Sequence, residues 1–175
     1  MTSSWRPGCP VGLGDLRLLR LSFWGFDGAP HTGELVVHRS VAADVVAVFG
    51  RLFDRRFPIH RMRLVDAYRG DDDRSMAADN TSGFNCRRSV GSPNEWSEHS
   101  YGKAIDINPV ENPWRRPDRI VPDAGRAFAD RAQIRPGMIV RPGPVVAALD
   151  ELGWEWGGDW RHAFDDHHIV WSRPL

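Results

Sequence analysis

The sequence has 175 residues, of which 41% are hydrophobic, so its length and composition fit one globular domain and exclude a fibrous or disordered protein. The 23 basic and 23 acidic residues balance to a formal net charge of zero, which excludes an overall field that would attract nucleic acid or anionic membranes. No run approaches the roughly 20 apolar residues that a bilayer-spanning helix needs.

The termini and cysteines say little about the compartment. The first 26 residues lack the basic start and apolar core of a signal peptide, which leaves a cytoplasmic location open. Cys9 and Cys86 are too few for a disulfide scaffold and are not spaced as a CxxC motif. The sequence leaves open whether they form one disulfide.

The first half of the chain mixes strands with one helix. Within a loop-rich N-terminal segment, 1–30, a strand is predicted at 16–26, and another follows at 33–38. Residues 40–57 form a predicted helix with Ser40 as N-cap and Pro58 beyond its end, because apolar residues recur at intervals of three and four: Val41, Val45, Val48, Phe49 and Leu52. A strand is predicted at 62–68. Residues 69–96 show no lasting period, and so long an irregular stretch in a compact domain is usually functional or disordered.

The second half carries a short strand at 104–108 and then a proline-rich surface excursion, 110–143, predicted as a wall or lid with a helical turn near 124–131. A helix with Pro144 at its start and Gly153 at C′ follows, and a strand at 167–171 closes the chain. This order predicts a single α+β domain over 1–175, with a small, mainly antiparallel sheet and a few helices.

Polar residues interrupt the strand pattern of "WSEHSYGKAIDINP", Trp96 to Pro109. His99 and Asp106 lie seven positions apart, a spacing that suits a loop followed by a strand, with Gly102 allowing the turn. Strand alternation places Asp106 on the face opposite Ile105 and Ile107. The pair alone is weak evidence for a metal site, since a histidine and an aspartate in a loop region are more often simple hydrogen-bonded residues.

A zinc hydrolase needs a third ligand and a base that is not a ligand. The segment "DWRHAFDDHHIVW" offers three histidines, His162, His167 and His168, and three acids, Asp159, Asp165 and Asp166. In a strand, only one of the adjacent His167 and His168 can face the site. Asp165 precedes His168 by three positions and could take a proton from water.

Two motifs carry a resemblance to a known family. "SEHSYGKAID" resembles the S-x-H-x-x-G-x-A-x-D signature of the zinc D-alanyl-D-alanine carboxypeptidase family, which includes vancomycin-resistance-type D,D-peptidases and L-alanyl-D-glutamate endopeptidases. "GWEWGGDWRHAFDDHH" resembles its closing segment. The resemblance implies one zinc ion on His99, Asp106 and His168, with Asp165 as general base. It also implies that Arg87 stabilises the oxyanion of the reaction, with Arg69 as the second choice for this role. Ser97 and Tyr101 are implied to bind the substrate.

The chain departs from the family where Ile169 and Val170 follow the last histidine, and where Asp166 and His167 precede it, so His167 competes as the third ligand. The resemblance implies an exported or wall-associated monomer that binds a peptidoglycan peptide. A D-alanyl-D-alanine carboxypeptidase is favoured over an L-alanyl-D-glutamate endopeptidase. The alternatives are a non-catalytic wall-binding or zinc-binding module and a domain without zinc.

The remaining motifs have simpler interpretations. We expect surface or hydrogen-bonded roles for the other histidines, namely His31, His38, His60 and His162. Three tryptophans could stack on sugars but are as easily core and loop residues: Trp154, Trp156 and Trp160. "DDDR", residues 71–74, lacks the ligand spacing of a calcium loop and is predicted to be a solvated turn.

Overall fold

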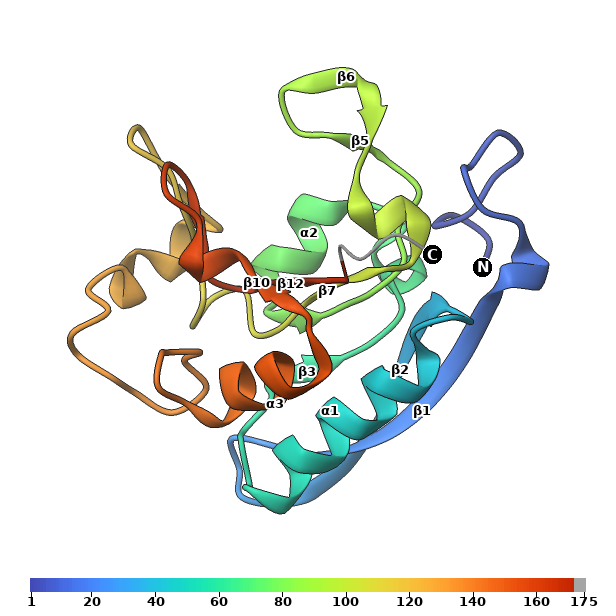
Figure 1. The fold of residues 1–175 in the computed structure, drawn as a ribbon. Coiled ribbons are helices and arrows are strands. Elements are labelled where there is room, and N and C mark those ends of the chain that lie inside the picture. Colours follow the sequence, from blue (N-terminus) through green and yellow to red (C-terminus); the bar gives the residue numbers. More distant parts are fainter. Residues whose placement is uncertain (172–175) are drawn as a thin grey trace.

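The computed structural model describes residues 1–171. A long antiparallel hairpin of β1 (Leu16–Trp24) and β2 (Pro30–His38) forms one side of the molecule, and α1 (Ala42–Asp54) packs against it (Figure 1). A short 3-10 turn, η1 (Leu13–Asp15), precedes the hairpin. Regular strand structure therefore begins at residue 16, and much of the segment 1–30 predicted as loop-rich belongs to this hairpin.

The amphipathic pattern of α1 is confirmed, because Val45, Val48, Phe49 and Leu52 are all buried. The predicted N-cap is wrong. Val41 occupies that position without a side-chain cap, while the hydroxyl of Ser40 contacts Nδ1 of His38 at 2.7 Å. The helix ends four residues before Pro58.

Residues 61–96 are more regular than predicted. β3 (Arg61–Met62) is followed by the 3-10 turn η2 (Val65–Tyr68). The predicted strand 62–68 is therefore wrong beyond Met62. In η2, Asp66 accepts hydrogen bonds from the N-terminal residues. Then come α2 (Asp72–Ala77), β4 (Asn80–Thr81), β5 (Arg88–Ser89) and β6 (Ser92–Trp96). These elements have two to six residues, too few to produce a readable period.

The centre of the fold is a three-stranded antiparallel sheet in the order β10 (Glu155–Trp156), β12 (His168–Val170), β7 (Ala104–Asp106). Ile105 pairs with Ile169, and both point into the main core. The helix α3 (Pro144–Leu152) packs into the same core, with Pro144 in its first turn and Gly153 ending it at φ 74°, as predicted. Between β6 and β7 lies the 3-10 turn η3 (Glu98–Tyr101).

The excursion 110–143 contributes a second small sheet. β8 (Trp114–Arg115) lies between β9 (Ile120–Val121) and β11 (Phe164–Asp165), all antiparallel. The 3-10 helix η4 (Asp123–Phe128) falls at the predicted helical turn, and a last turn, η5 (Gly157–Asp159), precedes β11. The architecture is thus α+β with small antiparallel sheets, as predicted, and β3–β4 is a two-residue parallel pair.

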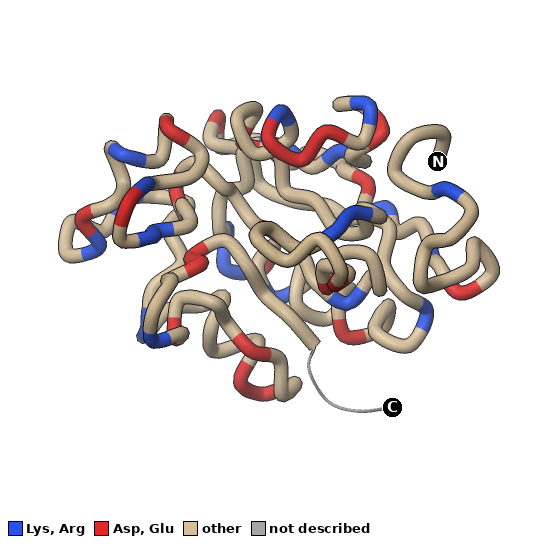
Figure 2. The backbone as a smooth tube through the Cα atoms, turned by 90° about the horizontal axis from the view of Figure 1, so that it is seen from above, with Lys and Arg blue, Asp and Glu red and all other residues tan. Residues whose placement is uncertain are grey.

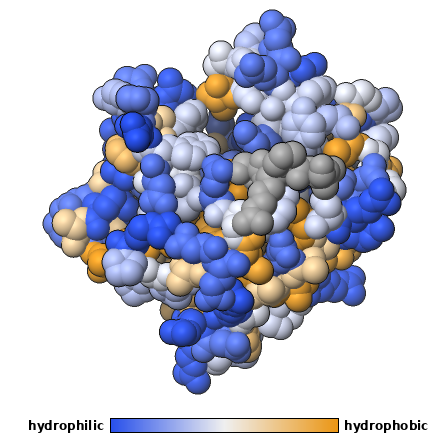
Figure 3. Space-filling view, viewed as in Figure 1, coloured by the Kyte–Doolittle hydropathy of each residue, from blue (hydrophilic) through white to orange (hydrophobic). Residues whose placement is uncertain are grey.

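Basic and acidic residues are interspersed along the backbone in Figure 2. The face in Figure 3 is mostly hydrophilic, with apolar residues scattered over it. Within residues 1–171, no helix is both long and apolar enough to cross a membrane.

Candidate metal centre and cleft

Three ligand candidates meet at one end of the central sheet. β12 pairs with β7 so that His168 lies directly opposite Asp106. Because Ile105 and Ile169 occupy the core face, strand alternation turns Asp106 and His168 to the other face. His99 reaches them from η3, which ends at Gly102 with φ 66°; a Cβ there would lie 2.6 Å from the backbone nitrogen of His38, so glycine is required.

The ligand atoms form a compact triangle. His168 Nδ1 lies 3.1 Å from Asp106 Oδ1, His99 Nε2 lies 3.2 Å from Asp106 Oδ2, and the two ring nitrogens are 3.3 Å apart. Atoms that share a tetrahedral zinc ion at 2.0–2.2 Å lie about 3.3–3.6 Å from one another, so the triangle is close to the size that zinc requires. Two imidazole nitrogens and one carboxylate are also a donor set that zinc prefers, so the three residues fit this metal.

The electrostatics of the triangle attract a positive charge, either a proton on a histidine or a metal ion. Nδ1 of His99 donates to the carbonyl of Gly83 at 2.8 Å, which leaves a lone pair on Nε2 when the ring is neutral. All three side chains are buried. Burial disfavours the charged carboxylate, but His99 and His167 outweigh it and hold the pKa of Asp106 well below its usual range. Burial lowers the pKa of His99, but the charge of Asp106 outweighs this effect and raises the pKa above its ordinary value.

His167 occupies a different place from His168. Its Nε2 is 2.9 Å from Asp165 Oδ1 and 3.8 Å from Asp106, while its Nδ1 faces the carbonyl of Asn112 at 2.8 Å. Both nitrogens thus face oxygen, as in an imidazolium. Burial lowers its pKa, but Asp165 and Asp106 raise it to about 10. The prediction that only one of the two histidines faces the site is wrong, because His167 precedes β12 and strand alternation does not apply to it.

Asp165 lies beside the triangle on the second sheet. In β11 it pairs with Trp114 of β8, and its half-buried carboxylate lines the same cleft as the three ligand candidates. The cleft has a volume of about 330 Å³. The carboxylate, a group able to accept a proton, lies close to His167 and faces the space next to the ligand candidates.

Arg87 also lines the cleft, and Arg69 does not. The guanidinium of Arg87 forms an ion pair with Asp72 at 2.7 Å, and its Nε is buried without a hydrogen-bond partner among residues 1–171. The hydroxyl of Ser100 holds its backbone, accepting from Arg87 N–H at 2.9 Å and lying 2.7 Å from Arg87 carbonyl oxygen. Arg69 is exposed, in a left-handed turn at φ 61°.

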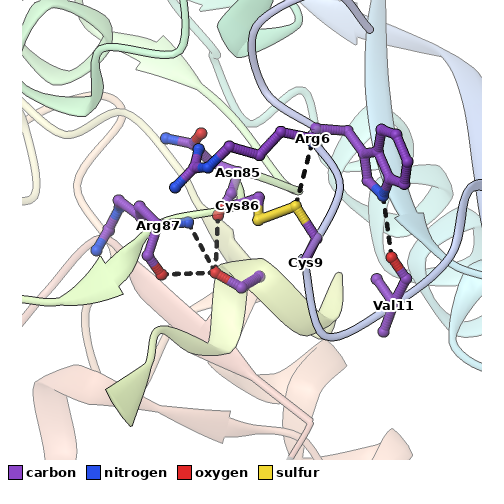
Figure 4. Close-up of a disulfide and its surroundings, with 8 residues drawn as sticks. Arg6, Cys9, Val11, Asn85, Cys86 and Arg87 are labelled. Carbon is purple, nitrogen blue, oxygen red and sulfur yellow. Dashed lines mark hydrogen bonds between the residues drawn. A yellow bond between two sulfur atoms is a disulfide. The ribbon is translucent and has the colours of Figure 1, made fainter. Parts of the chain in front are cut away.

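A disulfide joins Cys9 to Cys86, next to Arg87 (Figure 4). It ties the N-terminal loop to the segment that delivers Arg87 to the cleft.

The two residues expected at the substrate lie apart. Ser97 is buried and lines the cleft, whereas Tyr101 is 40% exposed and is not among the lining residues. Ser97 is the N-cap of η3, and Tyr101 is its last residue. The two ends of this short turn therefore face different surroundings.

Several residues of the cleft have no counterpart in the sequence predictions. Asp72 was predicted to be part of a solvated turn, which is wrong: Asp71 caps α2 by accepting from Arg74 N–H, and Asp72 pairs with Arg87. Trp114 and Arg119 also line the cleft and belong to the excursion that was predicted as a wall or lid. Trp160 lines it too, a residue that the sequence left between sugar stacking and core or loop packing. The buried Asp166 receives two hydrogen bonds from Arg115. For the pair of Asp166 and Arg115, one signal was present in the sequence, namely that Asp166 is an acid just before the motif histidines.

The simple interpretations of the other motifs hold for most residues. Trp154 and Trp156 belong to the core, whereas Trp160 is 37% exposed and its ring lies 5.5 Å from that of His168. His31 pairs with Asp27, His38 contacts Ser40, His60 lies near Asp79, and His162 is exposed.

Comparison with known families agrees with this geometry. No curated protein and no solved structure matches the chain. A family model described as D-alanyl-D-alanine carboxypeptidase matches residues 90–171, which include His99, Asp106, Asp165 and His168. Arg87 and Asp72 lie outside the matched segment. The match supports the family predicted from the sequence, over this segment of the chain.

Proposed function

We propose that the chain is a zinc-dependent metallopeptidase that hydrolyses peptidoglycan stem peptides, with the D-alanyl-D-alanine bond as the favoured point of cleavage. One observation carries the proposal. His99, Asp106 and His168 converge at distances suited to zinc, and the carboxylate of Asp165 lies in the same cleft.

Zinc held by these three residues would polarise the scissile carbonyl and make the attacking water more acidic. Asp165 accepts the proton of that water and passes it to the leaving amine. His167 keeps the Asp165 carboxylate in position through their 2.9 Å contact. Arg87, whose buried Nε has no other partner among the described residues, donates to the substrate oxygen as its negative charge grows.

The size of the cleft and the disulfide support a small peptide substrate outside the cytoplasm. A volume of about 330 Å³ is at the small end for ligand pockets, which suits a few amino acids better than a folded protein. Disulfides such as Cys9–Cys86 persist in oxidising compartments, as expected for an exported enzyme acting on the wall.

A non-catalytic binding module is the alternative of another class. Such a module needs metal ligands at most, while hydrolysis also needs a base. The presence of Asp165 at the cleft, held by His167, favours the enzyme.

The test is product analysis by mass spectrometry on two peptides, one ending in D-alanyl-D-alanine and one containing an L-alanyl-D-glutamate bond. The zinc-loaded protein is expected to release D-alanine from the first and to leave the second largely intact. Asp165→Asn should slow release about 100- to 10,000-fold without loss of metal. Cleavage of only the second peptide would identify an endopeptidase, and binding without cleavage of either would identify the non-catalytic module.

A further inference from the structure

A second groove joins the catalytic cleft at the β8–β9 hairpin. It has a volume of about 510 Å³ and lies between α2 and residues 119–124. Four residues line both spaces: Asp73, Met76, Arg119 and Val121. Arg119 therefore stands where the cleft and the groove adjoin.

The second sheet connects Arg119 to the general base. Asp165 pairs with Trp114, and Trp114 pairs with Val121, so the three form a row across β11, β8 and β9. All three line the cleft. Arg119 immediately precedes β9 and lines the same cleft as Val121. The row thus runs from Asp165 to a cationic side chain at its far end.

Arg119 has no ion-pair partner within residues 1–171, although Asp73 lines the same two spaces. Its guanidinium takes part in no ion pair, hydrogen bond or ring contact there. The other arginine of the cleft, Arg87, is already paired with Asp72 at 2.7 Å. The neighbouring arginines of the hairpin are paired as well, Arg115 with Asp166 and Arg116 with Asp118. An anionic group in the cleft would find Arg119 free to bind it without breaking an existing pair.

The direction of the reaction places such an anion. If Asp165 gives its proton to the leaving nitrogen, the residue attached to that nitrogen lies next to Asp165, over the row that ends at Arg119. Both candidate substrates have a carboxylate on that residue. Terminal D-alanine carries its α-carboxylate. D-glutamate has two carboxyl groups, and when one of them forms the bond to the next residue, the other stays free.

We propose that Arg119 binds the free carboxylate of the residue on the amine side of the scissile bond, and so selects substrates in which that residue is anionic. This inference rests on the proposed peptidase function and adds a specificity-determining residue to it. A guanidinium suits the role because it binds a carboxylate with two parallel hydrogen bonds.

The test compares two peptides that differ only at the C-terminus, D-alanyl-D-alanine as free acid and as carboxamide. We measure kcat/KM for the zinc-loaded wild type, Arg119→Ala, Arg119→Lys and Arg126→Ala. Arg126 is a matched control, because it is an exposed arginine of the same excursion, is paired with Asp123 and does not line either space. The binding of both peptides is also measured by calorimetry in an Asp165→Asn background, where turnover does not interfere.

The wild type and Arg126→Ala are expected to prefer the acid about 10- to 100-fold, the usual range for a charged hydrogen bond. Arg119→Ala should lose this preference through a slower reaction and weaker binding of the acid alone, and Arg119→Lys should keep part of it. An equal loss on both peptides, or an acid preference that survives in Arg119→Ala, overturns the inference. Acid-selective binding that depends on Arg119 but without turnover in the wild type would support the inference while refuting the proposed D-alanyl-D-alanine carboxypeptidase activity.

Discussion

The Cys9–Cys86 disulfide should supply a large share of the stability of the domain. It closes a loop with a sequence separation of 77 residues. In the chain-entropy model, a loop of that length restricts the unfolded chain enough to stabilise the folded state by about 4.5 kcal/mol. Replacing both cysteines, Cys9→Ser with Cys86→Ser, should therefore lower the free energy of unfolding by about 3–4.5 kcal/mol.

The assay is urea unfolding at neutral pH, followed by tryptophan fluorescence, on the oxidised wild type and on the double variant. Reductant serves as the control, because it should lower the stability of the wild type to that of the variant and leave the variant unchanged. Zinc binding should persist in the folded variant, since Arg87 is also held by Asp72 and Ser100 and the ligand candidates lie elsewhere. A loss below about 1 kcal/mol would refute the reasoning.

Three other perturbations test separate parts of the structure. Burial raises the pKa of Asp66, but hydrogen bonds from Ser4, Ser3 and Thr2 outweigh it and lower the pKa to about 2; the stability that Asp66 contributes is therefore complete above about pH 4 and lost as pH falls toward 2. Asp66→Asn should lower Tm by a few degrees at pH 6 and by progressively less below pH 4, and a constant difference down to pH 2 would contradict the assignment. Burial and the neighbouring Asp79 raise the pKa of Glu111 to about 8, so its ionisation costs stability as pH rises from about 4.5 to 8. Glu111→Gln should match the wild type near pH 4 and melt at a higher temperature near pH 8, and a difference in Tm that does not grow with pH would count against the pairing of these two acids. Arg87→Ala should reduce kcat about 100- to 1,000-fold, whereas Arg69→Ala, at an exposed position, should leave it near the wild-type value; steady-state release of D-alanine checks both, and equal effects would reject Arg87 as the oxyanion donor.

The ligand candidates could be predicted because the family resemblance names all three, and strand alternation supplies independent support for Asp106. In "AIDIN" the isoleucines face the core, so Asp106 faces away from it. By the same rule, His168 points to the other face of its strand from Ile169. The helices α1 and α3 were predictable for a similar reason, since each has an apolar face of sufficient length.

The excursion 110–143 was predicted as a wall or lid and does line the cleft, but the individual contacts of the walls could not be predicted, because they depend on pairings between distant short elements. Asp72 meets Arg87 only after α2, a helix of six residues, turns it toward the cleft. Arg119 joins the same space because a two-residue strand pairs with β8 and, through it, with β11 near the C-terminus. Neither contact leaves a periodic pattern in the sequence, and the position of His167 just before β12 lies outside the alternation rule.

The most direct test of the account is the zinc content of the purified protein, measured by elemental analysis after reconstitution and dialysis. The wild type should hold about one zinc per chain, and His99→Ala, Asp106→Ala and His168→Ala should each lose it. His167→Ala should keep it, because Nε2 of His167 lies with Asp165 rather than in the ligand triangle. No zinc in the wild type, or loss of zinc in His167→Ala with retention in His168→Ala, would contradict the proposed centre.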